Sequence, residues 1–116
     1  MIDSLPLALS EQDLLLVRQI LCNHVPDRPV YAFGSRASGH ARRRSDLDLA
    51  IGGQTPLSLL QRALLNEDFG ESDLPIKVDI VDLNSISPEF HRRIQRDFVT
   101  IQDFQDSAIT NEVVAQ

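Results

Sequence analysis

The chain has 116 residues, 42% of them hydrophobic and 24% charged, which suits one domain with a single hydrophobic core. No apolar run is long enough to span a membrane, and the first residues lack the basic cluster of a secretion signal. The net charge of −6 argues against broad nucleic-acid binding over the whole surface. The single cysteine excludes an internal disulfide and indicates a reducing, cytoplasmic location.

The first expected element is a helix that begins after Ser10. Serine is a favourable N-cap, and an acidic residue, Asp13, follows three positions later. Prolines at 26 and 29 end the helix and lead into an extended segment. Apolar residues at helical spacing predict its buried face: Leu14, Leu15, Leu16, Val17, Ile20 and Leu21.

A glycine and a serine follow the first expected strand, Val30 to Phe33. Gly34 lets the backbone approach a ligand closely because it has no side chain. Ser35 is expected to begin a short helix, where its hydroxyl and the free amides of the first turn can donate to a phosphate. This turn therefore predicts an anion site.

Two carboxylates alternate along the second expected strand, which runs from Ser45 to Ile51. A period of two places Asp46 and Asp48 on one face, and Leu47 and Leu49 on the other. Two ionised carboxylates so close together repel each other unless a cation or a shared proton lies between them. Oxygen ligands of this kind suit Mg²⁺.

A basic loop joins these two strands and contains His40, Arg42, Arg43 and Arg44. The arginine triplet is open to two interpretations: a solvated loop, or a surface that neutralises a nucleotide triphosphate or an acidic partner. Arg36 is the stronger candidate for phosphate binding, because a cation near a helix start opposes the helix dipole and needs a reason to be there.

Three further elements are expected after Gly52. Thr55 and Pro56 predict the start of a helix that runs to about Phe69 and stops at Gly70, with a buried stripe of Leu57, Leu60, Leu64 and Leu65. A third strand is expected over residues 76–83, with Asp79 in its middle, where a carboxylate needs a partner. Ser87 and Pro88 predict another helix, and residues 98–101 either a short strand or a helix-end anchor.

These elements predict an α+β fold. The glycine-serine turn and the carboxylate pair meet only if the first two strands are antiparallel, whereas the helical crossover favours a parallel third strand, which places Asp79 beside Asp48. The expected architecture is a small mixed sheet of three or four strands with helices mainly on one face. Residues 1–101 form the domain, and 102–116 are expected to be a polar tail or a marginal helix.

The spaced pattern of these residues resembles the minimal nucleotidyltransferase family, within the DNA polymerase β-like superfamily. The family has a glycine-serine turn, a second glycine and an Asp-x-Asp pair on the next strand, places filled here by Gly34, Ser35, Gly39, Asp46 and Asp48. The resemblance covers roughly residues 30–83. The chain departs from the pattern at Ser38, where the family commonly has arginine.

The resemblance implies a nucleotidyltransferase fold and a set of site residues. It makes Asp79 the third carboxylate, so Asp46, Asp48 and Asp79 are expected to be the catalytic and Mg²⁺-binding residues. Gly34, Ser35, Arg36 and Gly39 are the expected nucleotide-binding residues, with ATP as the substrate. Ser35 is then a phosphate ligand and not a nucleophile.

The resemblance also implies a partner, because larger relatives carry a helical domain that this chain lacks. Minimal members pair with a small helical HEPN ribonuclease toxin and act as antitoxins by placing AMP on a tyrosine of the toxin; both homo- and hetero-oligomers are compatible with this. One alternative is a non-catalytic module that neutralises its partner by binding alone. Another is a small-molecule nucleotidyltransferase, such as one that modifies an aminoglycoside, although the chain is short for that role.

Overall fold

The computed structural model describes residues 7–103 of the chain. Helices and strands alternate along most of this length, as expected for an α+β protein. In chain order the elements are α1 (Glu11–His24), β1 (Val30–Phe33), α2 (Ser35–Ser38), β2 (Leu47–Ile51), α3 (Leu59–Glu71), β3 (Val78–Asp82), α4 (Pro88–Gln95) and β4 (Val99–Gln102).

The four strands form one mixed sheet in the order β3-β2-β1-β4. β1 pairs antiparallel with β2, and Phe33 lies opposite Asp48. β2 pairs in parallel with β3, and Asp48 lies opposite Asp79. Both predictions are therefore confirmed: the antiparallel pairing expected from the meeting of the site residues, and the parallel pairing expected from the helical crossover. The segment around Ile101 is a strand, and it pairs antiparallel with the outer edge of β1.

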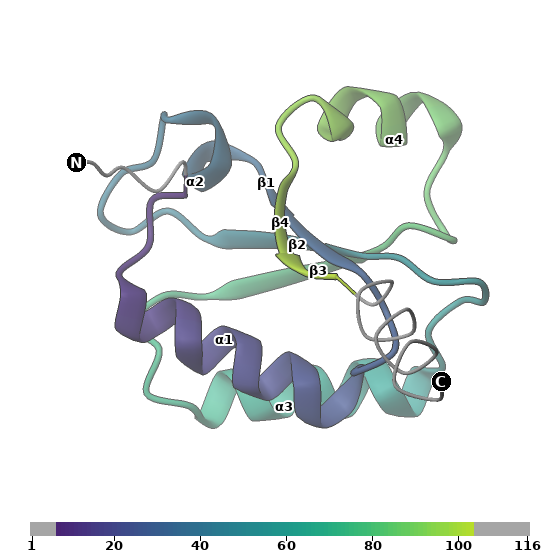
Figure 1. Cartoon of the computed structure of the whole chain (residues 1–116), viewed down its shortest axis with the longest axis horizontal. Coiled ribbons are helices and arrows are strands. Elements are labelled where there is room, and N and C mark those ends of the chain that lie inside the picture. The colour runs from purple at the N-terminus through teal and green to yellow at the C-terminus, as the bar shows by residue number, and fades with distance from the viewer. Residues whose placement is uncertain (1–6, 104–116) are drawn as a thin grey trace, which may run out of the picture.

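The two long helices, α1 and α3, lie together on one side of the sheet, and α2 and α4 lie on the other (Figure 1). Leu47, Leu49 and Ile51 of β2 point into the main core beneath the long helices. Ala50 points to the opposite face, where it packs with Phe33 and with Ile94 of α4. Alternation along the strands thus gives one fully covered face and one face covered only in part.

Serine N-caps begin α1 and α4 where the sequence predicts them. The Ser10 hydroxyl accepts a hydrogen bond from the backbone N–H of Asp13 at 3.1 Å. The Ser87 hydroxyl accepts one from the N–H of Phe90 at 3.1 Å, and Pro88 occupies the first helical position. Leu14, Val17, Ile20 and Leu21 form the buried face of α1, whereas Leu15 is 66% exposed.

The predicted start and stop of the third helix are wrong. α3 begins at Leu59, with Ser58 as its N-cap, and continues through Gly70 to Glu71. Ser58 and Gln61 form a capping box: the Ser58 hydroxyl accepts from the N–H of Gln61 at 3.0 Å, and the Gln61 side chain accepts from the N–H of Ser58 at 3.4 Å. Two backbone donors are satisfied together, which the Thr-Pro pair three residues earlier does not offer.

This shift in the start of the helix also changes its buried face. Leu65 and Phe69 are the buried residues of α3, and Leu57 packs against the core from the preceding loop. Leu60 and Leu64, predicted to be buried, are 68% and 42% exposed. The buried face of α3 therefore contains fewer residues than the leucine pattern in the sequence predicts.

The ends of the other elements differ from expectation by small margins. β2 begins at Leu47, so Asp46 immediately precedes the strand, and β3 spans 78–82 within the expected 76–83. β4 runs to Gln102, one residue past the predicted domain boundary. The predicted tail otherwise lies outside the described residues. Within residues 7–103, no helix has the length and apolar character needed to cross a membrane.

Candidate active site

Gly34 lies directly against the carboxylate of Asp48. It follows β1 with φ 78° and ψ −159°, a conformation that favours glycine. A Cβ added at this position would overlap the Asp48 Oδ2 atom. The turn after β1 and the carboxylate of β2 are therefore in direct contact, and only a glycine permits this close approach.

Asp48 stands at the centre of the three predicted carboxylates. It lies opposite Asp79 in the parallel register of β2 and β3, and Asp46 lies two residues before it. Burial raises the pKa of Asp48, and the negative charges of Asp79 and Asp46 raise it further. The three side chains are thus close enough for their charges to act on one another.

The donor set suits a hard cation such as Mg²⁺, because the carboxylates supply oxygen ligands and Asp48 carries unfavourable negative charge around it. In residues 7–103, however, no three Asp, Glu, His or Cys side chains converge closely enough to hold a metal ion. Asp79 Oδ1 instead pairs with Lys77 Nζ at 3.7 Å. Lys77 was not predicted as a site residue, although its position two residues before Asp79 places both on one face of the strand.

Arg36, predicted to bind the nucleotide, has a structural role that the sequence did not reveal. Its side chain is 8% exposed and is directed toward backbone carbonyls. Nε donates to Ser45 O at 2.9 Å and Nη1 to Ala8 O at 2.7 Å, while Nη2 donates to the carbonyls of Arg42 and Arg43 at 3.4 and 3.1 Å. These bonds occupy the guanidinium and order the loop that leads to Asp46, so they explain the buried cation without a phosphate.

The rest of this loop is held by short-range contacts. Gly39 ends α2 in the left-handed conformation, with φ 89°, and nothing lies within 4 Å of the place a Cβ would occupy. Ser38, where the family pattern has arginine, places its hydroxyl 3.0 Å from His40 Nδ1. The Ser45 hydroxyl accepts from the N–H of Arg42 at 2.8 Å. Gly39 is therefore required by its backbone conformation alone, while Gly34 is also required by its contact with Asp48.

The opposite end of the sheet is fixed by a buried carboxylate, Asp82, which is 4% exposed. Its Oδ2 accepts from the N–H of Leu57 at 2.8 Å and its Oδ1 from the N–H of Asn84 at 2.9 Å. Burial alone would raise the pKa of Asp82, but these hydrogen bonds, the Ser85 hydroxyl and the charge of Arg28 together lower it. Asp82 therefore holds the loop before α3 through the N–H of Leu57.

The mixed sheet, the glycine-serine turn and the facing carboxylates define a nucleotidyltransferase. The sequence profile of the Polymerase beta, Nucleotidyltransferase family matches residues 11–106, and the chain belongs to that family. A Haemophilus influenzae protein described as a probable protein adenylyltransferase, MntA, is 45% identical over 97 residues, which cover 84% of this chain and 85% of the relative.

Two solved structures resemble the chain in fold. One is described as a crystal structure of a toxin-antitoxin with AMP-PNP. Its TM-score is 0.66 at 25% sequence identity, and the match covers 86% of this chain and 80% of the chain in that structure. The other is a mutant of the MntA-HpeT toxin-antitoxin pair, with a TM-score of 0.65, 25% identity, and coverage of 87% and 80%. The similarity extends over nearly the whole described domain.

Proposed function

We propose that this nucleotidyltransferase transfers AMP from ATP to a tyrosine of a small helical HEPN toxin and thereby acts as an antitoxin. The observation that carries the proposal is the direct contact of the Gly34 turn with the Asp48 carboxylate, with Asp79 in register on the next strand. The resemblance to MntA and to a toxin-antitoxin structure with AMP-PNP supports the acceptor class and the nucleotide. A reaction that consumes ATP also agrees with the cytoplasmic location expected from the sequence.

The residues of the first turn are assigned to the phosphates. Gly34 lets the turn lie against the Asp48 carboxylate, the Ser35 hydroxyl donates to the phosphates, and Gly39 lets the chain return from α2 toward the carboxylates. Arg36 acts through the loop, because its donors bind backbone carbonyls. The protein's task in phosphoryl chemistry is mainly to position groups, and an ordered turn meets that need.

The three carboxylates are assigned to Mg²⁺. Asp46, Asp48 and Asp79 would hold the ion, which when bound supplies positive charge to the reacting phosphate. Asp48 is the central ligand of the three, since its carboxylate borders Gly34 and lies opposite Asp79 in the register of the sheet. Asp79 contributes once its carboxylate no longer pairs with Lys77. Its place beside Asp48 also suits it to accept hydrogen bonding from the acceptor hydroxyl.

One observation favours a second candidate, a module that neutralises its partner by binding alone. Asp79 pairs with Lys77, and within residues 7–103 no three potential ligands converge on a metal position. A protein that keeps this arrangement in its complex would bind the toxin without modifying it. The two candidates differ in a single measurable product.

The test is intact-mass analysis of the partner. The chain is produced with the protein encoded by the neighbouring gene, and the complex is incubated with ATP and Mg²⁺. We expect the partner to gain the mass of one or more AMP groups, and the gain to disappear with Asp48→Asn. Asp73→Asn, the same chemical change at an exposed site beyond α3, is the matched control and should leave the gain intact. A stable complex with no mass gain for the unchanged protein would overturn transfer in favour of binding.

A further inference from the structure

The outer face of α3 carries three exposed leucines. Leu59 is 88% exposed, and Leu60 and Leu64 are exposed as well. Single exposed leucines are common on protein surfaces, but these three lie within the first two turns of one helix. The core is contacted by the other side of the helix, through Leu65 and Phe69. The first half of α3 is therefore apolar on its outside as well as its inside, a pattern typical of helices that are covered on both sides.

The same outer face becomes acidic in the second half of the helix. Glu67 and Glu71 follow Leu60 and Leu64 at intervals of three and four residues, so the four side chains form one stripe along α3. Both glutamates are exposed, and within residues 7–103 neither forms an ion pair. The stripe thus presents leucines at one end and uncompensated negative charge at the other.

A hollow of about 310 Å³ opens between α1 and α3 beside the acidic end of the stripe. Asp68, Glu71 and Asp73 line it from α3 and the segment that follows, and Gln19 and Asn23 line it from α1. The lining contains three carboxylates and no lysine or arginine. The hollow therefore suits a cationic side chain that enters from outside the fold.

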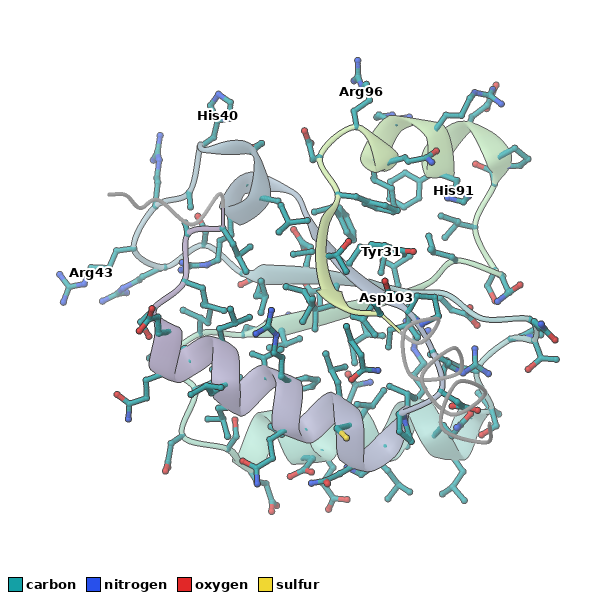
Figure 2. The ribbon with its side chains drawn as sticks, viewed as in Figure 1. Tyr31, His40, Arg43, His91, Arg96 and Asp103 are labelled. Atoms are coloured by element: carbon teal, nitrogen blue, oxygen red, sulfur yellow. The ribbon has the colours of Figure 1, made fainter. Side chains whose placement is uncertain are left out.

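The arginines of the two long helices are directed into the fold. Arg18 of α1 donates to the carbonyl of Ile101 at 3.0 Å, and Arg62 of α3 donates to the carbonyl of Ile80 at 2.6 Å. The basic side chains of His40 and Arg96 project from the other side of the sheet, away from α1 and α3 (Figure 2). Positive charge that complements the acidic half of the stripe is therefore best supplied by another molecule.

We propose that the outer face of α3 docks an amphipathic helix of a partner protein, with apolar residues against the leucines and lysines or arginines against Glu67, Glu71 and the hollow. This rests on the proposed function in one respect, because it takes the helical acceptor protein as the partner. A helix laid along an apolar stripe with charges at its end is a common mode of protein recognition.

Occupants supplied by the chain itself fit this face less well. A second copy would bring its own Glu67 and Glu71 against the same charges. Three leucines also offer an area on the order of a few hundred Å², against roughly 800 Å² per partner in a stable interface. Residues 104–116 contain Asp106 and Glu112 and no lysine or arginine, so they would add negative charge to the acidic half. A basic amphipathic helix matches both halves.

The docking face and the candidate active site lie on opposite sides of the sheet. Leu47 and Leu49 point into the core beneath the long helices, so Asp48, between them on β2, points the other way. Both α1 and α3 lie on the leucine side (Figure 1). A partner helix on α3 therefore leaves the carboxylates open, and the tyrosine reaches them from a different part of the partner or from a second copy of it. Association then needs neither nucleotide nor metal.

The test is calorimetric titration of the full chain with the protein encoded by the neighbouring gene, without ATP or metal. Leu60→Gln removes an apolar contact, keeps a good helix former and should weaken binding at least about fivefold. Leu15→Gln is the matched control, because Leu15 is 66% exposed and Leu60 68%. Leu15 lies nine residues before His24, which bonds to Asp68 of α3, and so faces away from α3. Its change should weaken binding less than about twofold.

A second pair of variants tests the acidic half of the stripe. Glu67→Gln with Glu71→Gln should weaken binding about threefold to tenfold at 20 mM salt. The effect should shrink at 300 mM salt, because the screening length falls from roughly 20 Å to roughly 6 Å. Glu11→Gln with Glu89→Gln removes the same charge from exposed positions on α1 and α4 and should change binding less than about twofold. All of these positions are exposed, so the variants should keep the fold, which urea titration checks.

Equal binding by Leu60→Gln and Leu15→Gln would overturn the proposal, as would unchanged binding after loss of the Glu67 and Glu71 charges at low salt. Single-turnover and steady-state transfer separate this result from the proposed function: Leu60→Gln should raise KM for the partner and leave kcat unchanged. AMP transfer with no effect of Leu60→Gln on binding would leave the proposed function standing and remove the docking face. Weakened binding of Leu60→Gln without transfer by the unchanged chain would do the reverse, and absence of any complex would remove both.

Discussion

Gly34 is the residue at which the backbone and the chemistry depend on each other most directly. Its positive φ and the Asp48 carboxylate beside it both exclude a side chain. Gly39 has a similar φ but open space around it. A side chain at Gly39 would therefore meet only the cost of the backbone conformation, whereas a side chain at Gly34 would also collide with Asp48.

Replacing each glycine with alanine measures the two costs. Gly39→Ala should lose about 1–2 kcal/mol of stability from the left-handed conformation, with nucleotide transfer reduced only modestly. Gly34→Ala adds an overlap with Asp48 Oδ2 and should lower the transfer rate at least about 100-fold, because it displaces a site carboxylate. Urea titration and single-turnover transfer to the partner check both. Equal rates for the two variants would show that Gly34 serves only the turn.

Asp48 should make the metal-free protein less stable near neutral pH. Burial and the charges of Asp79 and Asp46 raise its pKa in the folded state, so the folded protein resists ionisation of this group more than the unfolded chain does. The penalty is absent below the unfolded pKa of about 3.9 and is fully present above the raised folded value.

Asp48→Asn should therefore stabilise the metal-free protein at pH 7, by roughly 2–5 °C in Tm. The gain should shrink as the pH falls through the window between the unfolded and folded pKa values. Calorimetry in EDTA at several pH values measures it, with Asp73→Asn as the exposed comparison. A loss of Tm at pH 7 would mean that the Asp48 charge has a stabilising partner. The same variant abolishes transfer in the scheme above, so stability and activity move in opposite directions.

At the scale of elements, local signals predicted most of the fold. The serine caps at Ser10 and Ser87 begin the helices as expected. The meeting of the glycine-serine turn with the carboxylates predicted the antiparallel pairing, and the helical crossover predicted the parallel one. The Thr55-Pro56 pair predicts a start for α3 that is too early. The correct signal, the Ser58-x-x-Gln61 capping box, is also present in the sequence.

Other errors have no signal in one sequence. Arg36 and Arg42 look alike along the chain, yet only Arg36 is buried, because its partners are the carbonyls of Ala8 and of residues nine or fewer positions later. Backbone carbonyls carry no sequence information. The roles of Asp82 and Lys77 likewise depend on which groups the tertiary fold brings beside them. The spacing of residues in the sequence can thus identify candidate ligands. Only the tertiary structure shows which charged residues have a structural role and which remain available for function.

The capping box makes α3 a direct test of the corrected start. Ser58→Ala removes the acceptor for the Gln61 N–H and should cost about 1 kcal/mol. Asn66→Ala, at an exposed position within the same helix, should change stability by less than about 0.5 kcal/mol. Equilibrium urea unfolding measures both variants. If Ser58→Ala behaved like Asn66→Ala, the cap would contribute little to the free energy of unfolding.

At the scale of the whole molecule, the two ends of the sheet treat charge in opposite ways. At the site end, burial and the negative charges of Asp79 and Asp46 raise the pKa of Asp48. At the other end, Asp82 and Arg28 are buried with hydrogen-bonded partners: Arg28 donates to the carbonyls of Gly52, Thr55 and Pro56, and Asp82 accepts from Leu57 and Asn84. The hydrogen-bonded charges at one end of the sheet stabilise the fold, whereas an ionised Asp48 at the other end destabilises it.

This division predicts that Asp82 supports stability and leaves the chemistry alone. Asp82→Asn removes a charged acceptor of two backbone N–H groups and should cost about 1.5–3 kcal/mol at pH 7. Because the folded pKa of Asp82 is lowered, its contribution is present above about pH 3.9 and is lost as the pH falls through the folded value, so the variant and the unchanged protein should converge in acid. Urea titrations at pH 7 and pH 3 measure this, and transfer by the folded variant, assayed well below its Tm, should stay within about twofold of the unchanged protein. A large loss of transfer in a fully folded Asp82→Asn protein would show instead that the two ends of the sheet are coupled.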